Sequence, residues 1–161
     1  MIRIAERRDI PAMTEIYNEQ VRNGTATFDL EECSVENRTA WFEAHTGKYV
    51  LLVYEREGVV AGYASLSQYR VKAAYDSTVE LSVYVGAAFR GQGIGRALME
   101  ALLARARADE RLHTVVSVIT EGNAASCRLH ESLGFTHCGT VREAGRKFGR
   151  WIGIETYQIM G

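Results

Sequence analysis

The stretch TVELSVYVGAAFRGQGIGR, residues 78–96, joins a strand-forming segment to a glycine-rich turn. β-Branched and aromatic residues predict a strand over Thr78–Val85. The next segment, Gly93–Ala108, predicts a helix because apolar side chains recur on one face. They are Ile94, Leu98, Leu102 and Ala106. Thr114–Thr120 is nearly continuously apolar, which is typical of a strand covered on both faces. Together the three segments predict a strand–helix–strand unit with a parallel crossover.

The turn itself, Arg90-Gly91-Gln92-Gly93-Ile94-Gly95, has the features of an anion-binding loop. Glycines lack a β-carbon, so the backbone can approach a ligand closely and direct successive amides at it. The following helix adds free N–H groups and the positive end of its dipole, while Arg90 and Arg96 flank the loop and can add charge-assisted hydrogen bonds. We therefore expect a pyrophosphate to bind at residues 90–96. A tight turn whose glycines serve only helix packing is the alternative.

Two other nucleotide-binding loops do not fit this turn. A Walker loop ends in Gly-Lys-Ser/Thr, whereas Gly95 is followed by Arg96. A Rossmann fingerprint has GxGxxG on the first strand, whereas this chain has GxGxG three strands in. The turn therefore predicts neither of these sites.

The remaining segments complete one expected domain, residues 1–161. Ile2–Ala5 predicts a strand, and Asp9 is a candidate N-cap for a helix that ends at Gly24. Further predicted segments are a connector at Thr25–Leu30, a helix capped by Ser34 with Val35, Trp41 and Phe42 on its apolar face, strands at Tyr49–Tyr54 and Val59–Tyr69 around a turn at Glu55–Gly58, a helix at Asn123–Leu133 stopped by Gly134, and strands at Thr136–Glu143 and Trp151–Met160. The order β-α-α-β-β-β-α-β-α-β-β predicts a mixed α/β (α+β) fold around a single sheet.

The composition is typical of a soluble globular protein, with 47% hydrophobic and 24% charged residues. A net charge of −1 provides no global field to recruit nucleic acid or an anionic membrane. The three cysteines, Cys33, Cys127 and Cys138, form no CxxC pair, which argues against a disulfide framework and a structural zinc site. The sequence shows no signal peptide and no apolar run of membrane-spanning length. We therefore expect a cytoplasmic protein without a metal.

A second motif lies downstream of the loop. Asn123-Ala124-Ala125-Ser126 is followed by Leu129-His130 and Leu133-Gly134-Phe135. Together with Arg90-x-x-Gly93-x-Gly95, this segment resembles the two signatures of the GNAT acetyltransferase superfamily, Gln/Arg-x-x-Gly-x-Gly/Ala and Asn-x-x-Ala/Ser … Gly-Phe. Over nearly its whole length the chain is similar to the phosphinothricin/methionine-sulfoximine N-acetyltransferase branch. The similar segments include Ile16-Tyr17-Asn18, Thr25-Ala26-Thr27-Phe28, Ala40-Trp41-Phe42, Gly62-Tyr63-Ala64-Ser65, Ser82-Val83-Tyr84-Val85 and Lys147-Phe148-Gly149-Arg150-Trp151.

The resemblance implies a fold and an acetyl-CoA site. A mostly antiparallel mixed sheet would be flanked by about four helices, and the strand before the loop would be bent by a bulge and splayed from the next parallel strand. Acetyl-CoA, as co-substrate, would lie in that gap. The implied contacts are Val83, Tyr84 and Val85 for the pantetheine arm, Arg90, Gly91, Gln92, Gly93, Ile94, Gly95 and Arg96 for the pyrophosphate, and Asn123 and Ser126 beside them. Asn123 also fits a helix N-cap.

The chemistry implied by the resemblance is acyl transfer from a thioester to an amine. An α-amino group has a pKa of about 8 in peptides, so the enzyme needs a base, acting directly or through water. Glu80 stands at the position of the proposed general base of this branch; an edge-strand glutamate facing water is the alternative. His130 stands where many GNAT enzymes have a tyrosine acid. It would either protonate the thiolate or pack within its helix.

The acceptor site is expected around the loop that follows the second hairpin strand. Arg70 and Lys72 would hold a carboxylate or phosphinate-like group, with arginine the better bidentate partner, although a solvated loop explains these charges too. Leu81 stands where several relatives have histidine. The expected substrate contacts are Phe28, Arg70, Val71, Lys72, Glu80, Leu81 and Ser82, with Trp151 as a further wall, although such aromatics are more often core residues.

Three functions are compatible with these features. The leading hypothesis is an N-acetyltransferase that acts on a small amino acid or analogue by direct attack in a ternary complex. An acetyltransferase for a protein N-terminus or a polyamine would favour an acidic or open groove. A non-catalytic CoA-binding module is the third, and Glu80 argues against it. Relatives are commonly homodimers, and the apolar, aromatic C-terminal strands would supply an interface.

Overall fold

The computed structural model describes residues 1–161, which form one seven-stranded sheet and four α-helices. The strand order is β1-β2-β3-β4-β5-β7-β6. The strands are β1 (Ile2–Ile4), β2 (Leu51–Arg56), β3 (Val59–Gln68), β4 (Thr78–Val85), β5 (Thr114–Thr120), β6 (Thr136–Lys147) and β7 (Arg150–Met160). The helices are α1 (Ile10–Asn23), α2 (Val35–Glu43), α3 (Ile94–Ala108) and α4 (Ala124–Ser132), with 3-10 turns at Arg7–Asp9, Ala73–Tyr75 and Ala87–Phe89. The predicted order of elements is confirmed, and β4 and β5 begin and end at the predicted residues.

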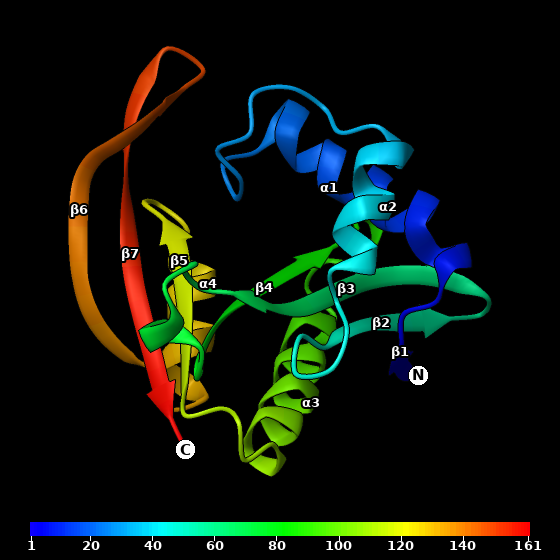
Figure 1. Cartoon of the computed structure of the whole chain (residues 1–161). Helices are drawn as coiled ribbons and strands as arrows, with labels where there is room; N and C mark the ends of the chain where they lie inside the picture. Colours follow the sequence, from blue (N-terminus) through cyan, green and yellow to red (C-terminus); the bar gives the residue numbers. More distant parts are fainter.

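β4 and β5 form the one parallel pair of the sheet, and they separate after three residue pairs. Thr78–Glu80 lies beside Thr114–Val116. Beyond these residues β4 stays paired with β3 up to Val85, while β5 stays paired with β7 up to Thr120. Figure 1 shows the two strands diverging. The expected splay is therefore present, and it opens just after Glu80.

The bulge expected in β4 is absent from its pairing with β3. That ladder runs from Gly62 opposite Val85 to Gln68 opposite Val79 without a shift in register. The separation instead arises on the β5 side, because β5 follows β7 while β4 follows β3. Right-handed twist rotates neighbouring strands relative to each other, so two halves of a sheet that lose their shared ladder diverge.

Helices cover both faces of the sheet. The predicted apolar face of α3 is confirmed, since Ile94, Leu98 and Leu102 are at most 1% exposed and pack in the main core. Each such side chain contributes about 1.5–3 kcal/mol through burial. α1 and α2 cover the opposite face, above a second cluster that includes Met13 and Tyr63 (Figure 1). None of the helices is long and apolar enough to cross a membrane.

Helix termini agree with the sequence in most places. Ser34 caps α2 by accepting a hydrogen bond from Asn37 N at 3.1 Å, and α1 ends at Gly24. Asp9 is the N-cap residue of α1, as predicted, but its side chain makes no capping hydrogen bond because the carboxylate binds Arg3 and Glu6 N instead. Val35 was expected on the buried face of α2 but is 47% exposed.

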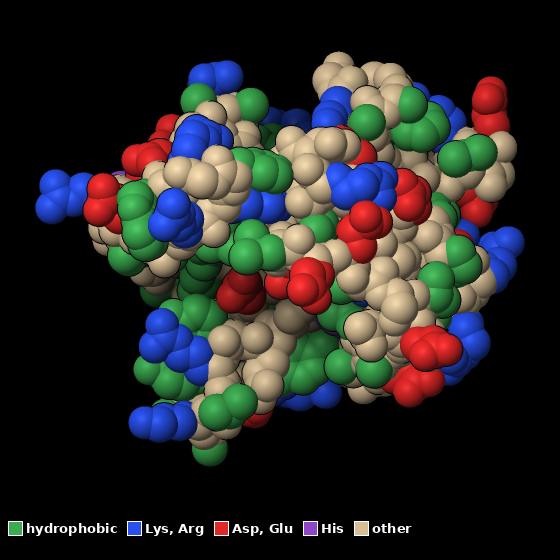
Figure 2. Space-filling model, turned by 90° about the horizontal axis from the view of Figure 1, so that it is seen from above, with side chains coloured by type: hydrophobic (Ala, Val, Ile, Leu, Met, Phe, Trp, Pro, Cys, Tyr) green, Lys and Arg blue, Asp and Glu red, His purple; other side chains and the backbone are tan.

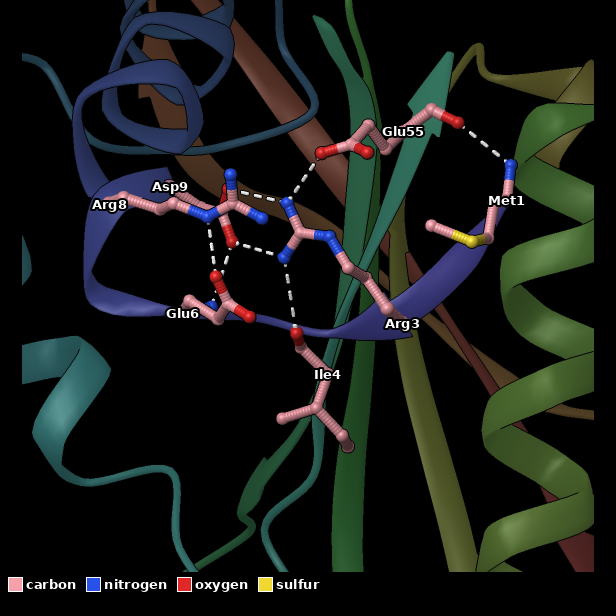
Figure 3. A network of polar contacts seen from close by, with 7 residues as sticks. All are labelled: Met1, Arg3, Ile4, Glu6, Arg8, Asp9 and Glu55. Carbon is pink, nitrogen blue, oxygen red and sulfur yellow. Dashed lines mark hydrogen bonds and ion pairs between the residues drawn. The ribbon is translucent and has the colours of Figure 1, made fainter. Parts of the chain in front are cut away.

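The Asp9 carboxylate belongs to a polar network that fastens the first strand (Figure 3). Arg3 donates to both Asp9 oxygens, at 2.7 and 2.9 Å, and to Glu55 Oε1 at 2.8 Å. Glu6 N donates to Asp9 at 2.7 Å. Asp9 is 4% exposed, and these hydrogen bonds overcome its desolvation and lower the pKa of its carboxyl group. The network therefore ties β1 to the turn before α1 and to β2.

The connector between α1 and α2 is fastened to the long β6–β7 hairpin (Figure 1). The Lys147 ammonium group donates to Thr27 O at 2.9 Å and to Gln20 O at 3.2 Å. Phe28 packs against Gly145, where an added β-carbon would lie 2.6 Å from the ring. Both strands of the hairpin are longer than predicted and meet at a turn over residues 148–149. The connector thus lies across the end of the sheet where β4 and β5 diverge.

Candidate active site

The glycine-rich turn between β4 and α3 presents a run of free backbone amides. Gly91 and Gly93 have φ values of 76° and 79°, a left-handed conformation that glycine adopts without steric cost. α3 begins at Ile94, and the first amide to find a partner is that of Ala97, which donates to Gly93 O at 3.1 Å. The amides of residues 91–96 make no hydrogen bond. This arrangement suits an anion at the positive end of α3.

The side chains of the turn lie at the surface and are held by neighbouring groups. The partners are Glu19 for Arg90 (2.7 Å), Glu100 for Arg96 (2.8 Å) and Arg56 for Gln92. Arg90 and Arg96 remain 45% and 49% exposed in their side chains, so both guanidinium groups stay accessible. Gly95 lies in the first turn of α3, where its missing side chain leaves space beside Val85.

A cleft of about 440 Å³ occupies the space between the separated halves of β4 and β5. It is lined by Ala26, Leu81, Ser82, Val83, Tyr84, Ser117, Val118, Ile119, Thr120, Asn123, Ser126 and His130. Three buried polar atoms among these residues have no hydrogen-bond partner: Ser117 Oγ, Thr120 Oγ1 and His130 Nε2. Buried polar atoms are rarely left unpaired. Their concentration here, together with the free amides of the turn, fits an extended ligand with hydrogen-bonding groups, as pantetheine has.

Asn123 caps α4 at the edge of this cleft. Its Oδ1 accepts a hydrogen bond from Ser126 N at 3.2 Å, as expected for an N-cap. Both residues also line the cleft. The capping interpretation of Asn123 is therefore confirmed, and its contact with a ligand stays a prediction.

His130 extends from α4 into the core at the back of the cleft. It is 2% exposed and packs against Phe135 and Tyr157. Its Nδ1 lies 2.8 Å from Ser126 O, a carbonyl oxygen that only accepts, so Nδ1 carries the proton and Nε2 is an acceptor in the neutral ring. Burial lowers the pKa of the imidazole. These features describe a neutral hydrogen-bond acceptor rather than a proton donor.

Glu80 is half-buried at the last residue pair before β4 and β5 separate. Its carboxylate makes no hydrogen bond or ion pair, and desolvation raises its pKa. It lies directly opposite Ser67 on β3, on the sheet face covered by α1 and α2. A carboxylate without a partner and with a raised pKa is suited to accept a proton.

A polar pocket that the sequence did not predict lies on this same face. Its lining residues are Tyr17, Asp29, Arg38, Trp41, Tyr63, Ser65, Ser67, Ser82 and Tyr84. Arg38 is 6% exposed and donates to the Tyr63 hydroxyl at 2.8 Å. Seen from above, the surface is hollowed between the α1–α2 side and the β6–β7 hairpin, and acidic side chains gather near its middle (Figure 2).

The spacing of polar and aromatic residues along α2 would have revealed this pocket. Arg38 and Trp41 stand at i and i+3 of α2, which places them on one helical face. His45 follows just after the helix, and its Nε2 lies 2.9 Å from Ser67 Oγ, at the strand position opposite Glu80.

Several expected acceptor contacts are not among the residues that line the polar pocket. Arg70, Val71 and Lys72 are exposed on the loop between β3 and β4 and line no pocket described above, and Arg70 lies over the rings of Tyr69 and Tyr75 instead. Leu81 is buried in the α3 core on the opposite face, because neighbouring strand residues alternate.

The two aromatic residues expected as walls behave differently from each other. Phe28 packs on the hairpin, beside the Ala26 and Asp29 positions that line the cleft and the pocket. Trp151 is 58% exposed, with the Arg146 guanidinium group over its ring. Trp151 is therefore no part of a pocket wall within this chain.

Comparison with known proteins agrees with this geometry. The acetyltransferase (GNAT) domain family matches residues 2–154. The chain belongs to the GNAT acetyltransferase family. It is 43% identical to an L-methionine sulfoximine/L-methionine sulfone acetyltransferase of Salmonella typhimurium over 98% of this chain and 92% of that protein.

Solved structures of GNAT proteins share the whole fold. A ribosomal-protein-alanine N-acetyltransferase from Brucella melitensis superposes with a TM-score of 0.96 at 41% identity, covering 100% of this chain and 99% of that one. A phosphinothricin acetyltransferase from Sinorhizobium meliloti, solved in complex with AcCoA, gives 0.95 at 35% identity, covering 99% and 87%. The GNAT fold expected from the sequence is therefore confirmed, and GNAT acetyltransferases use acetyl-CoA as the acyl donor.

Proposed function

We propose that this GNAT protein transfers an acetyl group from acetyl-CoA to the amine of a small amino acid or analogue of the phosphinothricin, methionine sulfoximine or methionine sulfone type. The position of Glu80 carries the proposal. It is a half-buried carboxylate without a partner at the fork between β4 and β5. The names of the relatives at about 40% identity support the substrate class.

The acetyl-CoA site and the acceptor site have separate residues in this proposal. Acetyl-CoA supplies a thioester whose acyl carbon is open to attack. The amides of residues 91–96 bind the pyrophosphate together with Arg90 and Arg96, and the cleft residues Val83, Tyr84, Val85, Asn123 and Ser126 bind the pantetheine arm. Unpaired amides and orphaned cleft atoms support this assignment.

Glu80 acts as the general base. The acceptor enters the pocket beside Ser82, on the Glu80 side of the sheet. Its amine nitrogen forms the new amide bond as the thioester C–S bond breaks, and the amine proton passes to Glu80 directly or through one water. The thiolate has a pKa of about 8.5, so it leaves without obligatory acid assistance. His130 then serves as a hydrogen-bond acceptor within the cleft and not as the acid.

A peptide N-terminus is a second candidate acceptor. The Brucella melitensis protein supports it through its name, and the acidic side chains near the middle of the upper face support it through their charge (Figure 2). The buried arginine in the pocket, Arg38, supports the smaller acceptor, whose anionic group it would bind.

Thiol release from acetyl-CoA with a panel of amines tests the proposal. The panel contains methionine sulfone, methionine sulfoximine, phosphinothricin, spermidine and an alanine-initiated peptide. We expect the three amino acids to be turned over with a kcat/KM at least 100-fold above those of the other two amines. Preference for the peptide would replace the leading proposal by the second. Binding of acetyl-CoA without turnover of any amine would indicate a CoA-binding module.

We also propose that residues 1–161 act as a single domain in the cytoplasm and form a homodimer. Exposed apolar side chains on the β6–β7 hairpin support the dimer; they are Val141, Phe148 and Trp151. Light scattering at micromolar concentration measures the oligomeric state, and a monomer would remove this part of the proposal.

A further inference from the structure

Arg38 is a buried cation without a counter-ion. It is 6% exposed, yet no carboxylate lies within 4 Å of its guanidinium group. One of its five N–H donors is used, by Nη2 toward the Tyr63 hydroxyl at 2.8 Å. Nε is buried without a partner. Nη1 makes no hydrogen bond either and is not among the buried unpaired atoms, so it faces open space.

Aromatic rings hold this guanidinium group in place. It lies 3.6 Å above the Trp41 ring and 4.5 Å from the Tyr17 ring centre. Such contacts offset part of the cost of burying a charge. They do not use its N–H donors, which lie in the plane of the group. A buried charge normally has a counter-ion, and the residues that line this pocket supply only the Tyr63 hydroxyl, which is neutral.

Asp29 is the one acidic residue that lines the pocket, and it already has a hydrogen-bond partner. Asp29 accepts a hydrogen bond from the Tyr17 hydroxyl and forms no ion pair with Arg38. Three serines, Ser65, Ser67 and Ser82, also line the pocket, and Ser67 lies opposite Glu80. The pocket therefore offers an unpaired cation, followed by uncharged polar groups that lead to the base.

The sheet register links this cation to the base. Tyr63, which binds Arg38, lies opposite Tyr84, and Ser67 lies opposite Glu80. Four residues along a strand span about 13 Å, which sets the scale of the separation between the two strand positions. A small molecule with an oxyanion at one end and an amine a few bonds away fits between the two groups.

We propose that Arg38 binds an oxyanion of the acceptor and thereby selects acidic amino acids and zwitterions over polyamines. The oxyanion is either the α-carboxylate or a side-chain phosphinate. This inference rests on the proposed function in so far as the ligand is the acetyl acceptor. The planar guanidinium fork binds such groups through two parallel hydrogen bonds.

The test compares acceptors that differ only in charge. Methionine sulfone, phosphinothricin and the α-carboxamide of each are assayed for thiol release, and each is titrated by calorimetry into protein saturated with CoA. The variants are Arg38→Gln, Arg38→Lys, which keeps the charge but loses the planar guanidinium group, and Arg111→Gln as the matched control at an arginine that is 61% exposed outside the cleft and the pocket. Thermal melting verifies that each variant is folded, and the KM for acetyl-CoA verifies the donor site.

We expect Arg38→Gln to raise the KM for methionine sulfone about 100-fold while kcat changes less than 5-fold. The preference of the wild type for the acid over the carboxamide should fall to below 3-fold in this variant, and Arg38→Lys should retain an intermediate preference. Arg111→Gln should behave as the wild type does. If binding of the α-carboxamide of phosphinothricin still depends on Arg38, the phosphinate is the group that Arg38 binds. If it does not, Arg38 binds the α-carboxylate.

An unchanged ratio of acid to carboxamide in Arg38→Gln, or in Arg38→Lys if the glutamine variant is unfolded, would overturn the inference while leaving the proposed function intact. Acid-selective binding that depends on Arg38, without turnover, would sustain the inference and refute the proposed function. Absence of binding by either acid to the wild type would overturn the role of Arg38.

Discussion

Glu80 and Ser67 face each other across the β3–β4 pair, and Ser67 Oγ lies 2.9 Å from His45 Nε2. The carboxylate itself has no partner, although hydroxyl groups and an imidazole lie next to it. Burial lowers the pKa of His45, so the ring is neutral near pH 7 and does not neutralise Glu80. This relationship leaves Glu80 available to accept a proton at the point where β4 and β5 separate.

The pH dependence of acetyl transfer follows from the raised pKa of Glu80. The carboxyl group must be ionised to accept a proton, so kcat falls as the pH drops through its pKa in the folded protein. Because desolvation raises this pKa, we expect the midpoint of the acid limb to lie above 4.5, the ordinary value. Steady-state rates at saturating substrates between pH 4.5 and 9 measure it. An acid limb that persists in Glu80→Gln would assign the titration to another group.

The left-handed conformation of Gly93 should be needed for acetyl-CoA binding. Gly93→Ala places a β-carbon at a φ of 79°, which costs about 1–2 kcal/mol, and shifts the amides that face the pyrophosphate. We expect the KM for acetyl-CoA to rise at least 10-fold. Gly47→Ala is the matched control, with a φ of 61° outside the site. It should lose similar stability and keep the wild-type KM, and equal effects of both variants on KM would contradict the loop assignment.

His130 should be dispensable for proton transfer. Its protonated nitrogen is bound to Ser126 O, and the lowered pKa of the ring leaves it neutral. We expect His130→Gln to reduce kcat less than about 10-fold and to preserve the shape of the pH profile, since general acids contribute about 10²–10⁴-fold. A folded variant that loses more than 100-fold in kcat would restore the acid role.

The Arg3–Asp9 pair should control stability at low pH (Figure 3). Asp9→Asn leaves the half-buried Arg3 with Glu55 as its remaining carboxylate partner, and we expect a loss of about 1–3 kcal/mol. The pKa of Asp9 is lowered in the folded state. Its contribution is therefore present above the unfolded pKa of about 3.9 and is lost as the pH falls through the folded value.

Urea unfolding at pH 7 and at pH 3 measures this effect of Asp9. The difference between wild type and Asp9→Asn should shrink at the lower pH. Glu43→Gln provides the control, because the Arg7–Glu43 pair is 64% and 56% exposed, and exposed pairs contribute little. A loss in Glu43→Gln as large as that in Asp9→Asn would contradict the assignment.

Sequence patterns predicted the frame of the fold well. Local signals in the sequence determined several elements. They are the apolar periodicity of α3, the apolar runs of β4 and β5, and the helix caps at Ser34 and Asn123. The splay followed from family resemblance. The sequences of β4 and β5 do not show where their shared ladder ends, because that depends on how β4 pairs with β3 and β5 with β7.

The acceptor side was harder to predict because it depends on contacts between distant segments. Arg38 looks like a solvated helical residue until the rings of Tyr17, Trp41 and Tyr63 close around it. Arg70 and Lys72 are exposed on their loop, and their role as anion ligands stays a prediction.

The central claim is that Glu80 removes the proton from the acceptor amine. Thiol release by Glu80→Gln at pH 7, with acetyl-CoA and methionine sulfone both saturating, tests it most directly. The account predicts a kcat lowered by about 10²–10⁴-fold with unchanged acetyl-CoA affinity by calorimetry. Turnover within 3-fold of the wild type would show that Glu80 is not the base.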